Sequence, residues 1–172
     1  MKSIATCGLI LFGALAVACG DDEPPGDECP PLETTYNPEI DPSRFVADVD
    51  NPLFPLVPGA SYSYTEGEHG TVEITVTSER RMIMGISTIV VHDVASLDGE
   101  VVEDTFDWYA QDVDGAVWYF GEDTMELRMG EVVRTEGSWE AGVDGAKPGI
   151  VVPAMPTVGM TYRQEYYSCH AE

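Results

Sequence analysis

Basic residues are scarce in this sequence. Eight Lys and Arg stand against 31 Asp and Glu among 172 residues, which gives a formal net charge of -23. Nucleic-acid affinity comes largely from basic side chains that displace counterions from phosphates. A strongly acidic surface also repels anionic lipid headgroups. The composition therefore excludes nucleic acid as a partner and fits a domain that faces an extracellular or periplasmic space.

Motifs of known chemistry are also missing. No CxxC or Cys/His spacing suggests a zinc site. Ser138 lacks the Gly-x-Ser-x-Gly elbow of hydrolases, because Glu140 stands two places after it. The glycine-rich segment 142–149 has neither a following helix nor the Lys-Ser/Thr pair of a phosphate-binding loop. The sequence therefore indicates no cofactor and assigns no catalytic residue.

Long apolar runs are limited to one, from Ile4 to Ala18, which follows Lys2. A helix that crosses a bilayer needs roughly 20 apolar residues, and this run stops at Cys19, with an acidic segment directly after Gly20. A short apolar run behind a positive charge is typical of an export signal. We therefore expect residues 1–18 to be a cleaved signal peptide.

The residues before Cys19 resemble the bacterial lipobox. They read Leu-Ala-Val-Ala-Cys, although a large aliphatic residue is usual where this sequence has Ala16. The resemblance implies a lipoprotein with acyl chains of the palmitate type on Cys19, and two or more such chains hold a protein stably on a membrane. Gly20 favours delivery to the outer membrane or cell surface. The alternative is an ordinary secretory signal that is cut nearby.

Cysteine is used sparingly. Of the four present, Cys7 lies in the signal and Cys19 is the lipidation site, which leaves Cys29 and Cys169. Free thiols outside the cytoplasm tend to oxidise. Cys29 and Cys169 are therefore candidates for a disulfide that would join the two ends of the mature chain.

Residues 19–44 are rich in Pro, Asp and Glu and poor in apolar residues. Such a composition does not bury a core, and its prolines favour extended conformations. We expect this segment to be a spacer between the lipid and a domain that comprises residues 45–172.

The domain has the period-two alternation of β-strands. Val72, Ile74 and Val76 alternate with polar residues, and Asp98-Gly99 is a hairpin-turn signal. We expect strands at 61–66, 71–78, 87–97, 100–111, 124–129, 131–135 and 160–167, with further strand residues on both sides of Asp114-Gly115. The fold class is therefore all-β: an antiparallel meander of about eight strands that forms a curved sheet, partial barrel or sandwich.

Five motifs resemble a family of uncharacterised bacterial secreted proteins and lipoproteins. They lie at Asn51–Gly59, Asp107–Asp112, Val117–Glu122, Gly137–Gly142 and Tyr162–Tyr166, and the resemblance covers roughly residues 45–167. It implies a shared β domain and no assigned activity. Members of this family continue beyond the Tyr-Arg-Gln-Glu-Tyr strand, so the resemblance also implies a domain that is truncated at its C-terminus.

Trp108, Trp118 and Trp139 are the candidate ligand-binding residues, since they lie among carboxylates such as Asp107 and Glu122. Carbohydrate-binding sites and glycosidases combine aromatic platforms with carboxylates in this way. Alternation along a strand sends neighbours to opposite faces, so at least half of these aromatics are expected in the core.

Asp112 and Asp114 form a weak calcium candidate. Their spacing does not match a calcium-binding loop, and an Asp-Gly pair between strands is already accounted for as a hairpin turn. We therefore expect a turn here and assign no metal site.

Three functional hypotheses remain. The first, which the sequence favours, is a non-catalytic lipoprotein of the cell envelope that binds a glycan, a hydrophobic ligand or an envelope protein. The second is a carbohydrate-active enzyme, for which no pair of carboxylates is fixed by the sequence. The third is a truncated remnant without activity.

Overall fold

The computed structural model describes residues 35–168. The expected signal peptide, the lipidation site Cys19, most of the spacer, and the Cys29–Cys169 disulfide lie outside the described residues. Within residues 35–168, no helix is long and apolar enough to cross a membrane.

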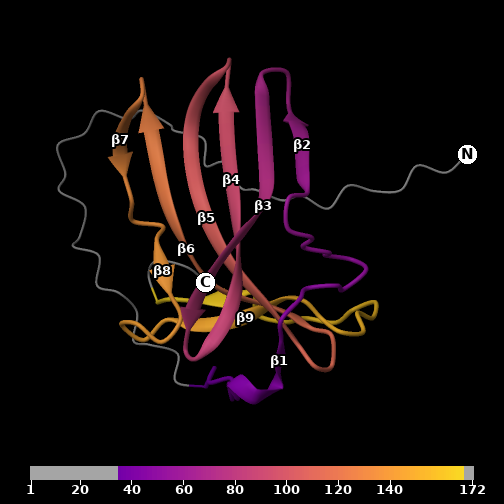
Figure 1. Cartoon of the computed structure of the whole chain (residues 1–172). Helices are drawn as coiled ribbons and strands as arrows, with labels where there is room; N and C mark the ends of the chain where they lie inside the picture. The colour runs from indigo at the N-terminus through magenta and orange to yellow at the C-terminus, as the bar shows by residue number, and fades with distance from the viewer. Residues whose placement is uncertain (1–34, 169–172) are drawn as a thin grey trace, which may run out of the picture.

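The described chain forms one antiparallel sheet that curls into a half-barrel (Figure 1). This confirms the expected all-β class and the curved meander. A short 3-10 helix, η1 (Pro42–Arg44), precedes the strands. The strands are β1 (Phe45–Val46), β2 (Ser61–Glu66), β3 (Gly70–Ile83), β4 (Ile86–Leu97), β5 (Glu100–Asp112), β6 (Val117–Arg128), β7 (Glu131–Arg134), β8 (Trp139–Glu140), β9 (Lys147–Val152) and β10 (Glu165–Tyr166).

Strand β6 organises the sheet. The strand order is β10-β9-β6-β5-β4-β3-β2, so β5 covers one edge of β6. Along its other edge β6 pairs in turn with β9, β8 and β7. In Figure 1, β9 runs across the base of the long strands. The segments after β6 therefore build a wall along this edge.

Three hairpin turns have both central residues at positive φ. Asp98-Gly99 joins β4 to β5 as expected, with φ values of 53° and 83°. Met84-Gly85 and Met129-Gly130 have the same geometry, which is that of a type I′ turn. The strand expected at 71–78 continues to Ile83, where the turn at Met84-Gly85 ends it. The sequence did not indicate this turn, because methionine is not a usual residue of such turns.

The last strand is shorter than expected. Only Glu165 and Tyr166 of the expected segment 160–167 form a strand, β10, which pairs with β9. Before it, the Ile150 amide donates to the Arg163 carbonyl at 2.8 Å. A Cβ on Gly149 would lie 2.3 Å from the Gln164 carbonyl carbon. The chain therefore crosses β9 at close range at Gly149 and does not run beside it as a long ladder.

Two apolar clusters cover the two faces of the sheet near β9. Val90, Trp108 and Phe120 belong to one cluster, whereas Ile89 and Val91 belong to the other. Neighbouring residues of a strand point to opposite faces, so both faces are buried at this end. The end of the sheet near β9 is therefore packed with apolar side chains on both faces.

Part of the expected spacer contacts the domain. The Tyr36 hydroxyl donates to the Pro148 carbonyl at 2.8 Å, and its ring lies 5.9 Å from that of Tyr166. Ile40 packs against the cluster that contains Phe120. Residues 35–44 therefore lie along the domain where the structure describes them.

Gln111 fixes the segment that leads into β2. Its Oε1 accepts hydrogen bonds from the Asp50 amide at 3.0 Å and the Asn51 amide at 2.8 Å. Its Nε2 donates to Asp50 Oδ1 at 2.8 Å. One buried side chain of β5 therefore holds the start of the Asn51–Gly59 motif against the sheet.

Candidate binding site

Carboxyl groups gather on one face of β4, β5 and β6. The register places Asp107 opposite Glu122 and Glu103 opposite Glu126. Asp93 on β4 lies opposite Thr105, which stands between those two pairs on β5. Cross-strand partners share a face of the sheet. We call the face that carries Asp93, Glu103, Asp107, Glu122 and Glu126 the acidic face.

A β-bulge in β6 brings Glu122 to this face. Asp107 pairs with Glu122 and Tyr109 pairs with Tyr119, so two residues of β6 stand opposite the single residue Trp108. In a regular strand, Tyr119 and Glu122 would point to opposite faces. The bulge adds one residue, and both side chains therefore reach the acidic face.

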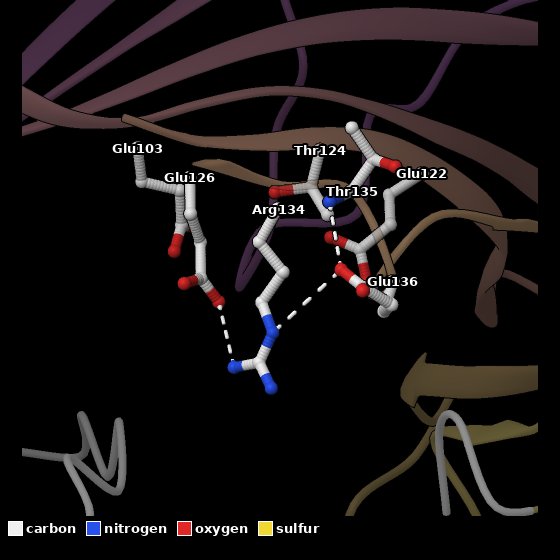
Figure 2. A pocket seen from close by; sticks show the side chains of 8 residues that line it. Glu103, Glu122, Thr124, Glu126, Arg134, Thr135 and Glu136 are labelled. Carbon is white, nitrogen blue, oxygen red and sulfur yellow. Dashed lines mark hydrogen bonds and ion pairs between the residues drawn. The ribbon is translucent and has the colours of Figure 1, made fainter. Parts of the chain in front are cut away.

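A pocket of about 180 Å³ lies on the acidic face beside the segment that follows β7. Figure 2 shows Arg134 reaching between Glu126 and Glu136, with contacts of 3.5 Å and 3.6 Å. The lining residues are Glu103, Glu122, Thr124, Glu126, Arg134, Thr135, Glu136 and Gly137. The pocket therefore combines four carboxyl groups with one guanidinium.

Hydroxyl groups fix the floor and wall of this pocket. The Thr105 and Thr124 hydroxyls, both buried, share a hydrogen bond of 2.6 Å between the two carboxyl pairs. Ser138 Oγ accepts from the Thr124 amide at 2.9 Å and donates to its carbonyl at 3.1 Å. These bonds hold the segment after β7 against β6, so the pocket is built into the sheet.

Burial raises the pKa of several carboxyls on this face. The pKa of Asp93 is raised to about 6, chiefly by burial and then by the charge of Glu103. Burial also raises the pKa of Glu103 and of Glu165 on β10. The acidic face therefore holds protons at pH values where exposed carboxyls have lost theirs.

The Asp107–Glu122 pair is affected most. Burial raises the pKa of Asp107 to about 7, although the Tyr119 hydroxyl, which donates to Oδ1 at 2.6 Å, opposes the rise. Burial and then the charge of Asp107 raise the pKa of Glu122 to about 8, with further contributions from Glu165 and Glu103. Two carboxyls that face each other across the strands therefore both have pKa values near neutral pH.

These groups form no ion pair in the part of the chain that the structure describes. No ion pair between residues 35–168 includes Asp93, Glu103, Asp107 or Glu122. In the same range, no group of three or more His, Cys, Asp or Glu is placed to hold a metal ion.

Trp139 places an unsatisfied donor at Glu122. Its Nε1 is buried and has no hydrogen-bond partner among the described residues, and the whole residue is 5% exposed. Trp139 pairs with Glu122 in the β6–β8 ladder, and its N–H acts on Glu122 as a donor that opposes the rise of the Glu122 pKa. The indole N–H is therefore directed at the Glu122 carboxyl without completing a hydrogen bond.

The three candidate tryptophans do not form one platform. Trp108 is buried on the face opposite the acidic face, with the Arg81 guanidinium 4.1 Å from its ring. Trp118 is half-buried, and its Nε1 donates to Asp112 at 2.9 Å. Of the three, Trp139 alone adjoins the acidic face.

Asp112 and Asp114 serve the turn between β5 and β6. Asp112 Oδ1 accepts from the amides of Asp114 and Ala116, at 3.0 Å each. Asp114 pairs with Arg44 at 2.5 Å. The two carboxylates are thus engaged by different donors, as the turn interpretation requires.

Sequence reasoning singled out Asp107 and Glu122 as neighbours of aromatics, and it missed Asp93, Glu103 and Glu126 as members of one site. A usable signal was present, because Glu103 and Asp107 are separated by four residues, as are Glu122 and Glu126. Such spacing places both members of each pair on one face of a strand.

Comparisons of this chain with models of protein families, with curated proteins and with solved structures found no match.

Proposed function

We propose that the protein is a non-catalytic binding module of the bacterial cell envelope, anchored to a membrane through lipid on Cys19, and that the acidic face is its binding surface. The observation that carries this proposal is the pocket lined by Glu103 and Glu122, which form no ion pair among the described residues. Polar groups that are held in place around a pocket fix the orientation of a bound ligand.

The geometry favours binding over carbohydrate chemistry. A glycosidase needs two carboxyls across a cleft that a sugar ring enters, and an exposed aromatic ring commonly supports that sugar. Asp107 is 9% exposed and Trp139 is 5% exposed, so neither offers a surface on which a sugar ring stacks. The carbohydrate-active alternative therefore has less support than a binding role.

The anchoring part of the proposal rests on the sequence of residues 1–19, with its short apolar run and lipobox-like end. The contact of Tyr36 with Pro148 adds a length constraint. Residues 20–34 separate the lipidated cysteine from the first described contact with the domain, so the spacer would be short.

Anchoring is tested by expressing the protein with its own signal, beside a Cys19→Ala variant. We expect the wild-type protein to partition into detergent with acyl mass on Cys19, and the variant to stay in the aqueous phase. Equal partitioning of both proteins, without acyl mass, would overturn the anchor.

Binding is tested by NMR with the exported Cys19→Ala chain. Fractions of envelope small molecules and glycans are added, and amide shifts are followed. We expect at least one fraction to shift residues around Glu103 and Glu122, with His92 and Asp104 on the opposite face unaffected. Absence of shifts with every fraction, or shifts confined to the opposite face, would refute the assignment of the binding surface.

A further inference from the structure

One cationic side chain of the protein, that of Arg134, already lies in the pocket on the acidic face. The Arg134 guanidinium lies 3.5 Å from Glu126 and 3.6 Å from Glu136 (Figure 2). Arg134 is 59% exposed at its side chain, and exposed pairs with such long contacts contribute little free energy. Arg134 can therefore leave Glu126 at small cost, and the position that it occupies is suited to an organic cation.

The carboxyls are arranged as two pairs with a neutral gap. Glu103 pairs with Glu126, and Asp107 pairs with Glu122, while the hydrogen-bonded Thr105 and Thr124 stand between them. Four residues along a strand span about 13 Å between backbone positions. Of the second pair, Glu122 lines the pocket. A compact ion contacts only one end of the pocket, whereas a linear molecule with positive charges at separated nitrogens reaches both Glu122 and the Glu103–Glu126 pair.

The buried N–H of Trp139 favours the ionised form of Glu122. An ionised carboxylate is a much stronger acceptor than a neutral acid, and an unsatisfied buried donor costs free energy. With burial and the neighbouring charge of Asp107 raising its pKa to about 8, Glu122 is mostly protonated at pH 7. A cation in the pocket would stabilise ionised Glu122 and thereby complete the hydrogen bond from Trp139.

Charged groups face Glu122 from each element packed around it. The carboxyls come from β5 with Asp107 and Glu103, from β10 with Glu165, and from the pocket wall with Glu136. Asp93 on β4 acts on Asp107. Arg134 is the one basic residue that lines the pocket. Negative charge thus dominates the surroundings of Glu122.

On the basis of the proposed binding role, we propose that this pocket takes a linear alkyl polyamine, with one ammonium at the Glu103–Glu126 pair and another at Glu122. Glu122 loses its proton to solvent as the ammonium docks. Trp139 Nε1 then donates to the carboxylate that forms.

The test uses isothermal titration of the exported Cys19→Ala chain with spermidine at pH 7, in two buffers of different ionisation enthalpy. We expect one saturable site and release of about one proton, so that affinity falls about tenfold between pH 7 and pH 6. We also expect the Trp139 indole proton to move downfield in NMR spectra. Octane-1,8-diol, which is linear and neutral, should not bind.

Matched variants separate this site from diffuse attraction to an acidic protein. Glu122→Gln should abolish the proton release and weaken spermidine binding at least tenfold, with folding checked by circular dichroism. Asp104→Asn removes one carboxylate from the opposite face and should leave both unchanged. Equal effects of the two variants, or binding without proton release, would overturn the proposal in favour of nonspecific condensation.

Two further outcomes distinguish this inference from the proposed function. If spermidine fails while an envelope fraction shifts residues of the acidic face, the polyamine is wrong and the binding surface stands. If calcium binds the pocket and spermidine does not, the ligand class is wrong. If no fraction and no spermidine shift these residues, both proposals are refuted.

Discussion

The Tyr119 hydroxyl donates a 2.6 Å hydrogen bond to Asp107, on the strand that sets Asp107 opposite Glu122. This bond favours the ionised form of Asp107, and burial, which is the larger effect, favours the neutral form. The resulting pKa of about 7 places the ionisation of a buried group within the physiological range. The stability of the fold is therefore linked to pH through the acidic face.

Stability should fall as pH rises from 5 to 8. Asp93, Asp107 and Glu122 have raised pKa values of about 6, 7 and 8 in the folded protein, whereas unfolded carboxyls titrate near 4. The folded state thus binds more protons in this window, and its advantage is full below about pH 4 and lost as pH passes through the folded values. Urea unfolding at several pH values measures this; a profile that is flat or rises toward pH 8 contradicts it.

Asp107→Asn should stabilise the protein more at pH 8 than at pH 5. The asparagine side-chain oxygen still accepts the hydrogen bond from the Tyr119 hydroxyl. The substitution also removes a buried charge. Each pKa unit corresponds to about 1.4 kcal/mol, so we expect a gain of about 2–4 kcal/mol at pH 8. Asp104→Asn is the control, since Asp104 is paired with His92 on the opposite face and should not flatten the pH profile.

Gly121→Ala should disrupt the bulge in β6. Gly121 has φ of 128°, and a Cβ there would lie 2.2 Å from the Trp139 carbonyl oxygen. We expect a loss of about 3 kcal/mol or more in the free energy of unfolding, from backbone strain together with displacement of β8.

Gly130→Ala is the matched control for this substitution. Gly130 also has positive φ, at 78°, but a Cβ there meets nothing within 4 Å. The expected loss is about 1–2 kcal/mol, from the left-handed backbone alone. Thermal unfolding of both variants makes the comparison, and equal losses would show that the approach of β8 does not depend on Gly121.

The strands were largely predictable because their signal is local. Alternation at 72–76 and the Asp98-Gly99 turn identify hairpins from a few adjacent residues. The acidic face was not predictable in this way, because its membership depends on which residues stand opposite each other. The bulge opposite Trp108 decides that Tyr119 and Glu122 share a face, and it results from pairing between segments that no short window contains.

Gln111→Leu should loosen the segment that precedes β2. The substitution removes the acceptor for the Asp50 and Asn51 amides; the Asn51 amide is buried, and an unsatisfied buried donor costs about 1–3 kcal/mol. We expect a loss of about 1–3 kcal/mol and faster hydrogen exchange in residues 50–56.

Gln111→Glu separates the acceptor from the amide donor. It keeps an acceptor oxygen but confronts Asp50 Oδ1, which the Gln111 amide now contacts. Its loss of stability should therefore grow as the introduced carboxyl ionises, because two neighbouring carboxylates repel each other. A loss that is independent of pH would indicate that packing, and not charge, governs this position.

The strand order has a consequence for how the chain reaches its fold. Each strand from β3 to β7 pairs with the strand that comes directly before it in the sequence. Contacts of short sequence separation form quickly. A chain that folds during its synthesis can therefore add one hairpin after another. Three segments have to wait: β1 pairs with β5, and β8 and β9 return to β6. The last steps of assembly are thus the docking of the N-terminal segment, of β8 and of the strand that crosses the base.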